Sequence, residues 1–129
     1  MVLDASVVLE VLLRTPESDA ITDRILGAGT QLYAPHTSST WKSSGYYRYM
    51  ARGQVTESRG REALDLLAVF PLTRYAHEPL LGRIWQLRER LTANDAAYVA
   101  LAEALRVTLL TRDQRLARIT GVRVTVQWA

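Results

Sequence analysis

Short apolar runs alternate along this chain with longer segments in which apolar residues recur at helical spacing. The short runs are typical of buried strands, and the longer ones are typical of amphipathic helices. The predicted strands are Met1–Leu3, Gln31–Ala34, an extended segment over Val69–Arg74, Val107–Thr111, and a last strand with alternating Val122, Val124 and Val126. The predicted helices are Ser6–Leu13, Pro16–Gly27, Thr40–Ala51, Thr56–Leu67, His77–Arg90, Thr92–Leu105 and Gln114–Arg118.

Local signals support several of these helix boundaries. Thr15 followed by Pro16 predicts an N-cap with proline in the first helical turn. Thr92 stands three residues before Asp95, which is the spacing of a capping box. In the predicted helix His77–Arg90, apolar residues recur at helical spacing and predict a face that packs inward. The residues of this face are Leu80, Leu81, Ile84, Trp85, Leu87 and Leu91.

Strands separated by helices predict βαβ units and a parallel sheet covered on both faces. The expected fold class is therefore α/β, a three-layer α/β/α domain with a short, mainly parallel central sheet. The chain has 129 residues, of which 48% are hydrophobic and 22% charged, and this is enough for one core and too little for two. We expect a single domain over residues 1–129.

Composition narrows the chemistry that this domain can perform. The chain has no cysteine and only two histidines, His36 and His77, so disulfides and thiolate zinc sites are excluded and any metal must be held by oxygen. We find neither a signal peptide nor an apolar segment of membrane-spanning length, and we expect a cytoplasmic protein. The net charge of +3 makes a polyanionic partner plausible without identifying one.

Three aspartates occupy positions where a parallel sheet commonly builds a site. Asp4 directly follows the first predicted strand, Asp113 follows Val107–Thr111 after one intervening residue, and Asp95 lies in the first turn of the helix that Thr92 opens. Ligands bind in such sheets at the carboxyl ends of the strands. Three carboxylates gathered there repel one another unless they share protons or a cation, so the pattern favours a magnesium site.

Each aspartate also has a purely structural interpretation. Asp4 can cap the helix that follows it, Asp95 can complete a capping box with Thr92, and Asp113 can serve as a turn residue or cap the helix from Gln114. Taken singly, each of these roles is more common than metal binding. The repetition of strand followed by aspartate at both ends of the chain favours a site.

Three segments of the chain resemble the PIN-domain ribonucleases and, within them, the VapC toxins of bacterial toxin–antitoxin pairs. They are Val2–Ser6, Leu91–Glu103 and Leu110–Ala117. The resemblance implies a magnesium-dependent endoribonuclease, with manganese as a substitute ion, that forms a homodimer and is neutralised by a VapB-type antitoxin. It places Asp4, Asp95 and Asp113 on acidic metal-binding and catalytic positions, and Ser6 and Thr111 on supporting polar positions.

The fourth acidic position of the family does not match. The family carries a glutamate early in the helix after the second strand, and ungapped alignment of the flanking segments places Trp41 there. Tryptophan cannot bind magnesium. Reading GC-rich codons for Ser38–Ser44 in another frame gives Ile-Asp-Val-Glu-Val-Val, which resembles the family motif. We therefore hypothesise that Thr37–Tyr47 was read out of frame between two compensating indels, and resequencing of the coding DNA tests this.

The interpretation that follows is metal-assisted hydrolysis of RNA. Asp4 and Asp95 hold magnesium directly or through waters, Asp113 supports the site or a second ion, and a water activated by magnesium attacks phosphorus. Arg112 and Arg115 are the predicted RNA-binding residues. Loss of the fourth acid predicts weakened activity. The alternative is a degenerate, inactive module that still binds its antitoxin, and a third interpretation makes all three aspartates helix caps.

Overall fold

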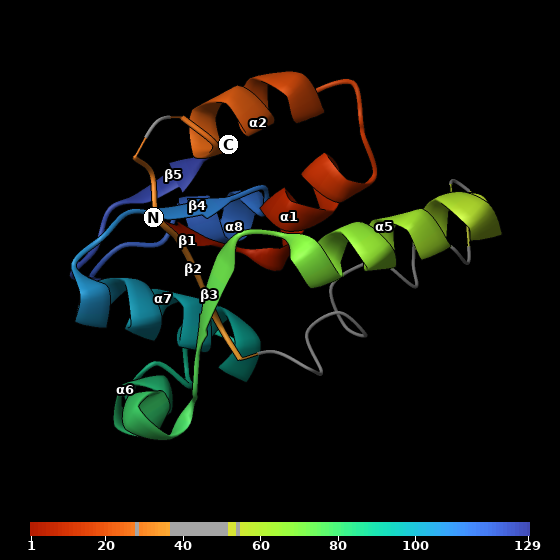
Figure 1. Cartoon of the computed structure of the whole chain (residues 1–129). Helices are drawn as coiled ribbons and strands as arrows, with labels where there is room; N and C mark the ends of the chain where they lie inside the picture. Colours follow the sequence, from red (N-terminus) through yellow and green to blue (C-terminus); the bar gives the residue numbers. More distant parts are fainter. Residues whose placement is uncertain (28, 37–51, 54) are drawn as a thin grey trace.

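A five-stranded sheet forms the centre of the computed structural model, which describes residues 1–27, 29–36, 52–53 and 55–129 (Figure 1). The strands lie in the order β3-β2-β1-β4-β5, and all four neighbouring pairs are parallel. Their bounds are Val2–Leu3 for β1, Leu32–Pro35 for β2, Leu72–Tyr75 for β3, Leu109–Thr111 for β4 and Val126–Trp128 for β5. The first strand therefore lies in the middle of the sheet, beside a strand from near the end of the chain.

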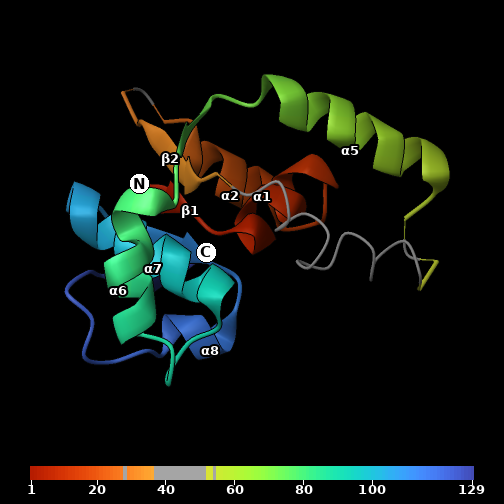
Figure 2. The same ribbon diagram turned by 90° about the horizontal axis from the view of Figure 1, so that it is seen from below.

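Helices cover both faces of this sheet. The helices α1, α2 and α5 lie on one face, and η1, α6, α7 and α8 lie on the other (Figures 1 and 2). Their bounds are Ala5–Leu12 for α1, Ser18–Ile25 for α2, Glu57–Val69 for α5, Glu78–Leu80 for the 3₁₀ helix η1, Leu81–Gln86 for α6, Ala93–Leu105 for α7 and Gln114–Ala117 for α8. The predicted fold class, a three-layer α/β/α domain with a parallel sheet, is confirmed.

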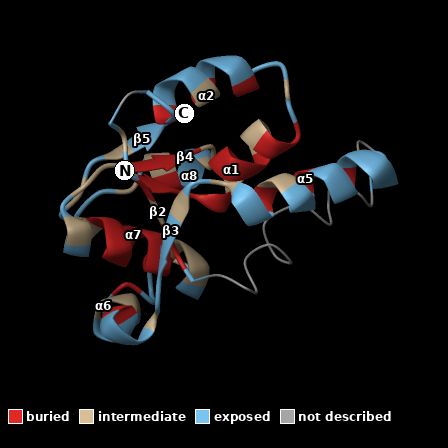
Figure 3. Ribbon diagram, in the orientation of Figure 1, coloured by how far each residue is buried: buried red, intermediate tan, exposed pale blue. Residues whose placement is uncertain are grey.

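The two central strands divide their side chains between the two faces. Val2 and Leu109 belong to the core under α7, whereas Leu3 and Leu110 belong to the core under α1. All four are fully buried, which explains why these strands read as continuous apolar runs rather than as alternating ones (Figure 3). The residues that directly follow these strands are consequently fixed at one edge of a rigid sheet.

The helix α7 contains the longest unbroken run of buried residues among the helices that the structure describes. Every residue from Ala96 to Ala102 is buried, and the small alanine side chains allow α7 to lie close to β1, β2 and β4. Glu103 ties the far end of α7 to α6, since its carboxylate accepts hydrogen bonds from Arg83 Nε at 2.7 Å and Nη2 at 3.0 Å. This rigid helix carries Asp95 in its first turn.

Most predicted elements are present, with shifted boundaries. The helix after Pro16 begins only at Ser18, because the Thr15 hydroxyl bonds the Glu10 carboxylate and Thr15–Glu17 form a turn. Val69 ends α5 rather than opening a strand, and β3 starts at Leu72, after Pro71. Pro35 is the last residue of β2 rather than the residue that stops it. The predicted helix over Thr40–Ala51 lies outside the described residues.

Two predictions about the second half of the chain were wrong in detail. The first concerns His77–Arg90, which is a 3₁₀ turn followed by the short helix α6. Leu81 and Trp85 are exposed at 55% and 67% rather than facing inward. The inward stripe is narrower than predicted and holds Leu80, Ile84, Leu87 and Leu91.

The second concerns the last strand, which is shorter than predicted. It pairs with β4 only from Val126 onward, although Val122 and Val124 do pack against the core. Their alternation therefore reflects burial of every second side chain in a loop and not strand pairing. No helix in the described ranges is long and apolar enough to cross a membrane.

Candidate active site at the carboxyl ends of β1 and β4

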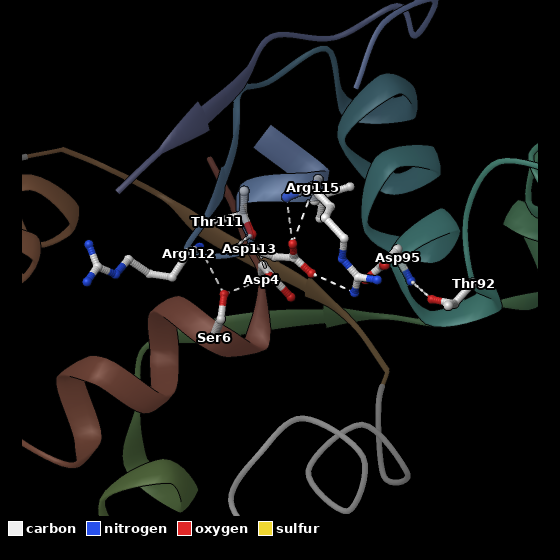
Figure 4. Close-up of polar contacts among 9 residues, drawn as sticks. Asp4, Ser6, Thr92, Asp95, Thr111, Arg112, Asp113 and Arg115 are labelled. Atoms are coloured by element: carbon white, nitrogen blue, oxygen red, sulfur yellow. Dashed lines mark hydrogen bonds and ion pairs between the residues drawn. The ribbon is translucent and has the colours of Figure 1, made fainter. Parts of the chain in front are cut away.

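Asp4 is the centre of the polar cluster at the edge of the sheet. It follows β1, precedes α1 and is 7% exposed. Its Oδ2 atom accepts two hydrogen bonds of 2.7 Å, one from the Ser6 hydroxyl and one from the Thr111 hydroxyl (Figure 4). Asp4 is the N-cap residue of α1, as the structural interpretation predicted, but its side chain does not make the usual capping hydrogen bond with the amide of the second or third helical residue.

The two hydroxyls that bond Asp4 also hold the loop after β4. Ser6 Oγ accepts the backbone N–H of Arg112 at 3.0 Å, and Thr111 Oγ1 accepts the backbone N–H of Asp113 at 3.0 Å. Because each hydroxyl accepts from an amide and donates its proton to Asp4, the direction of both donations is fixed. Both donations reach Oδ2, so Oδ1 is the Asp4 oxygen that neither hydroxyl occupies.

Asp113 caps the short helix α8 with one carboxylate oxygen. Its Oδ1 accepts the backbone N–H groups of Arg115 at 2.8 Å and Leu116 at 3.4 Å. Its Oδ2 lies 3.4 Å from the Arg115 guanidinium. The predicted capping role is therefore confirmed, and it leaves the second oxygen on the side of Asp4 and Asp95 (Figure 4).

Asp95 approaches the same place from α7. Its backbone N–H donates to Thr92 Oγ1 at 3.2 Å, which confirms the Thr92 cap predicted from the sequence. Its side chain is partly buried and points towards Asp4, Asp113 and the guanidinium of Arg115 (Figure 4). Thr92 therefore caps α7 through the backbone of Asp95, while the carboxylate of Asp95 belongs to the cluster.

The carboxyl groups of Asp4 and Asp95 have raised pKa values. Burial raises the pKa of Asp4, the charge of Asp113 raises it further, and hydrogen bonds from Thr111, Ser6 and the Ala5 amide oppose the rise. Burial and then the charge of Asp4 raise the pKa of Asp95, with a smaller contribution from Asp113. Each of these carboxylates therefore favours protonation or a nearby cation.

Asp113 behaves differently from its two neighbours. Burial works to raise the pKa of its carboxyl, but hydrogen bonds from the Arg115 amide and guanidinium and from the Leu116 amide outweigh burial and lower it. The cluster therefore combines one readily ionised carboxylate with two that resist ionisation. A cation close to Asp4 and Asp95 would relieve the repulsion that these two carboxylates experience.

The two arginines predicted to bind RNA have different surroundings. Arg112 is 22% exposed, donates to the Ala129 carbonyl at 3.0 Å and lies over the Trp128 ring, 4.8 Å from its centre. Arg115 is 89% exposed and reaches from Asp113 towards Asp95 (Figure 4). This placement favours Arg115 over Arg112 as the residue that meets a ligand at the cluster.

The site offers carboxylate oxygens, which are the donors that hard divalent cations prefer. In the described part of the chain, no group of three or more His, Cys, Asp or Glu side chains is close enough to hold a metal ion. Magnesium does not require such a cage, because it commonly takes one or two carboxylates and keeps several waters. Asp4 and Asp95 are the residues that fit direct ligation, because burial and the charge of a neighbouring carboxylate raise the pKa of each, Asp113 acting on Asp4 and Asp4 acting on Asp95.

One predicted site position lies outside the described residues, and two residues beside the site were not predicted from the sequence. Trp41, and the segment Thr37–Tyr47 proposed to be read out of frame, lie outside the described residues. Arg90 and Arg118 are not among the residues that the sequence predicted for the site, yet both line a cavity beside Asp95. The spacing of Arg115 and Arg118, three residues apart next to the aspartate that opens α8, was the signal that could have identified one of them.

Comparison with known families supports the arrangement. The family model described as the PIN domain matches residues 1–122. The chain belongs to the PIN-domain family. It is similar to Ribonuclease VapC9 of Mycobacterium tuberculosis, at 39% identity over 91% of this chain and 88% of that protein. It is also similar to Ribonuclease VapC12 of the same organism, at 32% identity over 98% of this chain and 97% of that protein. These relatives place this PIN domain among the VapC proteins.

Solved structures show the same fold. The VapBC2 crystal structure from Rickettsia felis, bound to a DNA fragment from its promoter, matches with a TM-score of 0.65 at 15% identity. The match covers 98% of this PIN domain and 96% of that chain. PAE2754 from Pyrobaculum aerophilum matches with a TM-score of 0.67 at 20% identity. This match covers 97% of this PIN domain and 81% of that chain. At these identities the likeness concerns the fold alone.

Proposed function

We propose that this chain is a magnesium-dependent endoribonuclease and the toxin component of a VapBC-type pair, acting as a single domain over residues 1–129. The observation that carries the proposal is the meeting of Asp4, Asp95 and Asp113, which come from three distant parts of the chain. Membership of the VapC proteins supports RNA as the substrate, because the relatives are named ribonucleases. The raised pKa values of Asp4 and Asp95 support a cation as the missing component.

The residues of the site divide the work in this proposal. Asp4 and Asp95 hold the ion directly or through waters, and Asp113 either supports them or holds a second ion. Ser6 and Thr111 keep Asp4 in place by donating to Oδ2, which presents Oδ1 to the ion. Bound magnesium would polarise a phosphoryl oxygen and lower the pKa of a water, and manganese would substitute for it.

The arginine of α8 has a separate role. The guanidinium of Arg115 meets Asp113 only at 3.4 Å, and the side chain is almost fully exposed, so it can turn towards an RNA phosphate. Arg112 is the weaker candidate for this contact because Trp128 and Ala129 occupy its guanidinium. We therefore assign the orientation of the RNA backbone mainly to Arg115.

The test is RNA cleavage with magnesium, with a chelator, and with the variants Asp4→Asn and Asp95→Asn. We expect cleavage in magnesium, none in chelator, and a loss of at least about 100-fold in each variant, as for a misplaced catalytic group. Cleavage that survives the chelator and both substitutions would rule out the metal-dependent mechanism. Arg61→Gln, on the far helix α5, is the control for a general loss of positive charge.

A second candidate is favoured by Trp41, which stands where the family carries its fourth acid. In that case the chain is a degenerate toxin that binds its antitoxin and cuts nothing. The wild-type chain would then fail to cleave RNA in magnesium while forming a stable complex with the antitoxin. Under the first candidate, the same sample cleaves RNA weakly and the Asp4→Asn variant does not.

The remaining parts of the proposal concern partners and location. We propose a VapB-type antitoxin as the protein partner, a homodimer as the assembly and the cytoplasm as the place of action. The similarity to the VapBC2 structure supports the fold on which such a partner docks. Light scattering of the purified chain, alone and mixed with the antitoxin, measures both assemblies. A monomeric mass for the chain alone would contradict the dimer.

A further inference from the structure

A cavity of about 310 Å³ adjoins the carboxylate cluster on the side of α7 and α8. Asp95 and Arg115 belong both to this cavity and to the cluster, so the two are continuous. Two further arginines, Arg90 and Arg118, line the cavity, and Asp95 is the only acid among its described lining residues. The cavity therefore carries an excess of positive charge directly beside the proposed cutting site.

Arg90 is held in the cavity without losing its charge. Its guanidinium donates to the backbone carbonyl of Thr120 and lies against Gly121, whose missing Cβ would stand 3.0 Å from Nη1. Gly121 has φ of +72°, a conformation that favours glycine, so the turn both requires this residue and makes room for the arginine. A neutral carbonyl fixes the position of the guanidinium and leaves its charge available for an anion.

Arg115, within α8, and Arg118, the residue that follows α8, both line the cavity. They are three residues apart, and such residues lie on one side of a helix. Arg118 is exposed, and among the described residues neither Arg118 nor Arg90 forms an ion pair. Two arginines that converge on one cavity without a carboxylate partner repel each other, and an anion between them would remove that repulsion.

We propose that this cavity binds a phosphate of the RNA backbone next to the phosphate that is cut, with Arg90 and Arg118 as its ligands and Arg115 between the two phosphates. The proposal rests on the ribonuclease function proposed above. RNA is favoured over an acidic protein segment because the cavity opens onto the carboxylate cluster, so a strand that enters the cluster must continue past these arginines. The guanidinium geometry also suits bidentate contact with phosphate.

The experiment measures binding separately from cutting. A fluorescein-labelled single-stranded RNA of mixed sequence is titrated with the full chain in excess chelator, and the dissociation constant is followed over a series of salt concentrations. The variants are Arg90→Gln, Arg118→Gln and Arg118→Lys. The matched control is Arg61→Gln, which removes the same charge from α5, on the opposite side of the molecule from α8 (Figure 2).

We expect Arg90→Gln and Arg118→Gln each to weaken RNA binding about three- to tenfold at low salt. The slope of the logarithm of the binding constant against the logarithm of the salt concentration should become shallower by about 0.7 for each lost phosphate contact. Arg118→Lys should keep the salt dependence of the wild-type chain, and Arg61→Gln should change neither quantity. A peptide of glutamates with the charge of the RNA should bind weakly and equally to all variants.

Three results would overturn the inference. Equal RNA binding by Arg90→Gln, Arg118→Gln and Arg61→Gln would remove the phosphate site while leaving the nuclease proposal intact, provided that magnesium still supports cleavage. A selective loss of glutamate-peptide binding in the two cavity variants would identify a protein-binding surface instead. No RNA binding by the wild-type chain, together with no cleavage in magnesium, would overturn both proposals.

Discussion

The Thr111 hydroxyl donates a 2.7 Å hydrogen bond to Asp4 Oδ2 across 107 positions of the sequence. The same hydroxyl accepts the Asp113 amide at 3.0 Å, so one side chain at the end of β4 joins two of the three carboxylate residues. Thr111 is fully buried, and water cannot replace either contact. The position of Asp4 relative to Asp113 therefore depends on this hydroxyl.

Replacing Thr111 by valine tests that dependence. Thr111→Val keeps the shape of the side chain but leaves the Asp113 amide without its acceptor and Asp4 with one donor fewer, so we expect a loss of about 1–3 kcal/mol in the free energy of unfolding. Cleavage should fall by about 100-fold if the carboxylates move by about 1 Å. Urea unfolding and RNA cleavage measure the two effects. Thr111→Ser retains the hydroxyl and should therefore retain most of the stability and most of the RNA cleavage. Wild-type stability of Thr111→Val would contradict the proposed dependence on this hydroxyl.

Asp4→Asn should stabilise the metal-free protein in a pH-dependent way. The pKa of Asp4 is raised in the folded state, so the folded state holds its proton more tightly than the unfolded state. The free energy of unfolding of the wild type should then fall as pH rises from the ordinary carboxyl pKa of 3.8 through the raised folded value. A tenfold difference in proton affinity between the folded and unfolded states corresponds to about 1.4 kcal/mol.

Asparagine does not titrate, so the stability advantage of Asp4→Asn should grow with pH over this window and then remain constant. Unfolding in urea at a series of pH values, with a chelator present, measures the difference. The other titrating groups are shared by the two proteins, and Asp95, whose pKa the charge of Asp4 raises, changes the comparison in the same direction as Asp4 itself. An advantage that shrinks as pH rises would show that folding lowers the pKa of Asp4 instead of raising it.

Asp113 allows its two roles to be separated. Asp113→Asn keeps an oxygen that can accept the Arg115 and Leu116 amides, whereas Asp113→Ala removes the cap of α8. We expect the alanine variant to lose about 1 kcal/mol of stability and the asparagine variant to lose little. Both should lose magnesium-dependent cleavage, since both lack the charge. Wild-type cleavage by Asp113→Asn would leave Asp113 with the capping role alone.

Trp41→Glu should restore the fourth acid of the family. A ligand that binds only the folded state raises its stability by about 2.7 kcal/mol at 100 times its dissociation constant. We therefore expect magnesium to raise the melting temperature of Trp41→Glu more than that of the wild type, with a matching gain in cleavage. Trp41→Gln removes the tryptophan without adding charge and is the control. An equal response of the two variants would show that position 41 is not a metal ligand.

The sequence predicted well those elements in which local signals and tertiary packing agree. The strand–aspartate–helix order at Asp4, the Thr92 cap and the Asp113 cap all follow from short-range chemistry that the fold preserves. The proximity of the three aspartates followed from topology, because parallel strands present their carboxyl ends at one edge. The mutual influence of these carboxylates on their pKa values agrees with that expectation.

Other features depend on contacts that a single sequence does not reveal. Helical spacing predicts that Trp85 faces inward, yet in α6 it faces outward. The guanidinium carbon of Arg88 lies over its ring, 4.2 Å from the ring centre. Thr15 reads as a cap, but its hydroxyl is taken by Glu10 from the preceding helix. The cavity of Arg90 and Arg118 arises from a turn at Thr120–Gly121 that packs against the loop before α7, and no periodicity marks such a meeting.

The strand order also determines when the site can appear during synthesis. The central strand β1 is synthesised well before its neighbour β4, since Asp4 and Thr111 are 107 positions apart in the sequence. Pairing of such distant segments is slow, because the chain must close a long loop before the contact contributes. A nascent chain that has exposed α1, α2 and even α7 has Asp4 and Asp95 but no β4 to position them. The proposed site can therefore form only after β4 has been synthesised and has paired with β1.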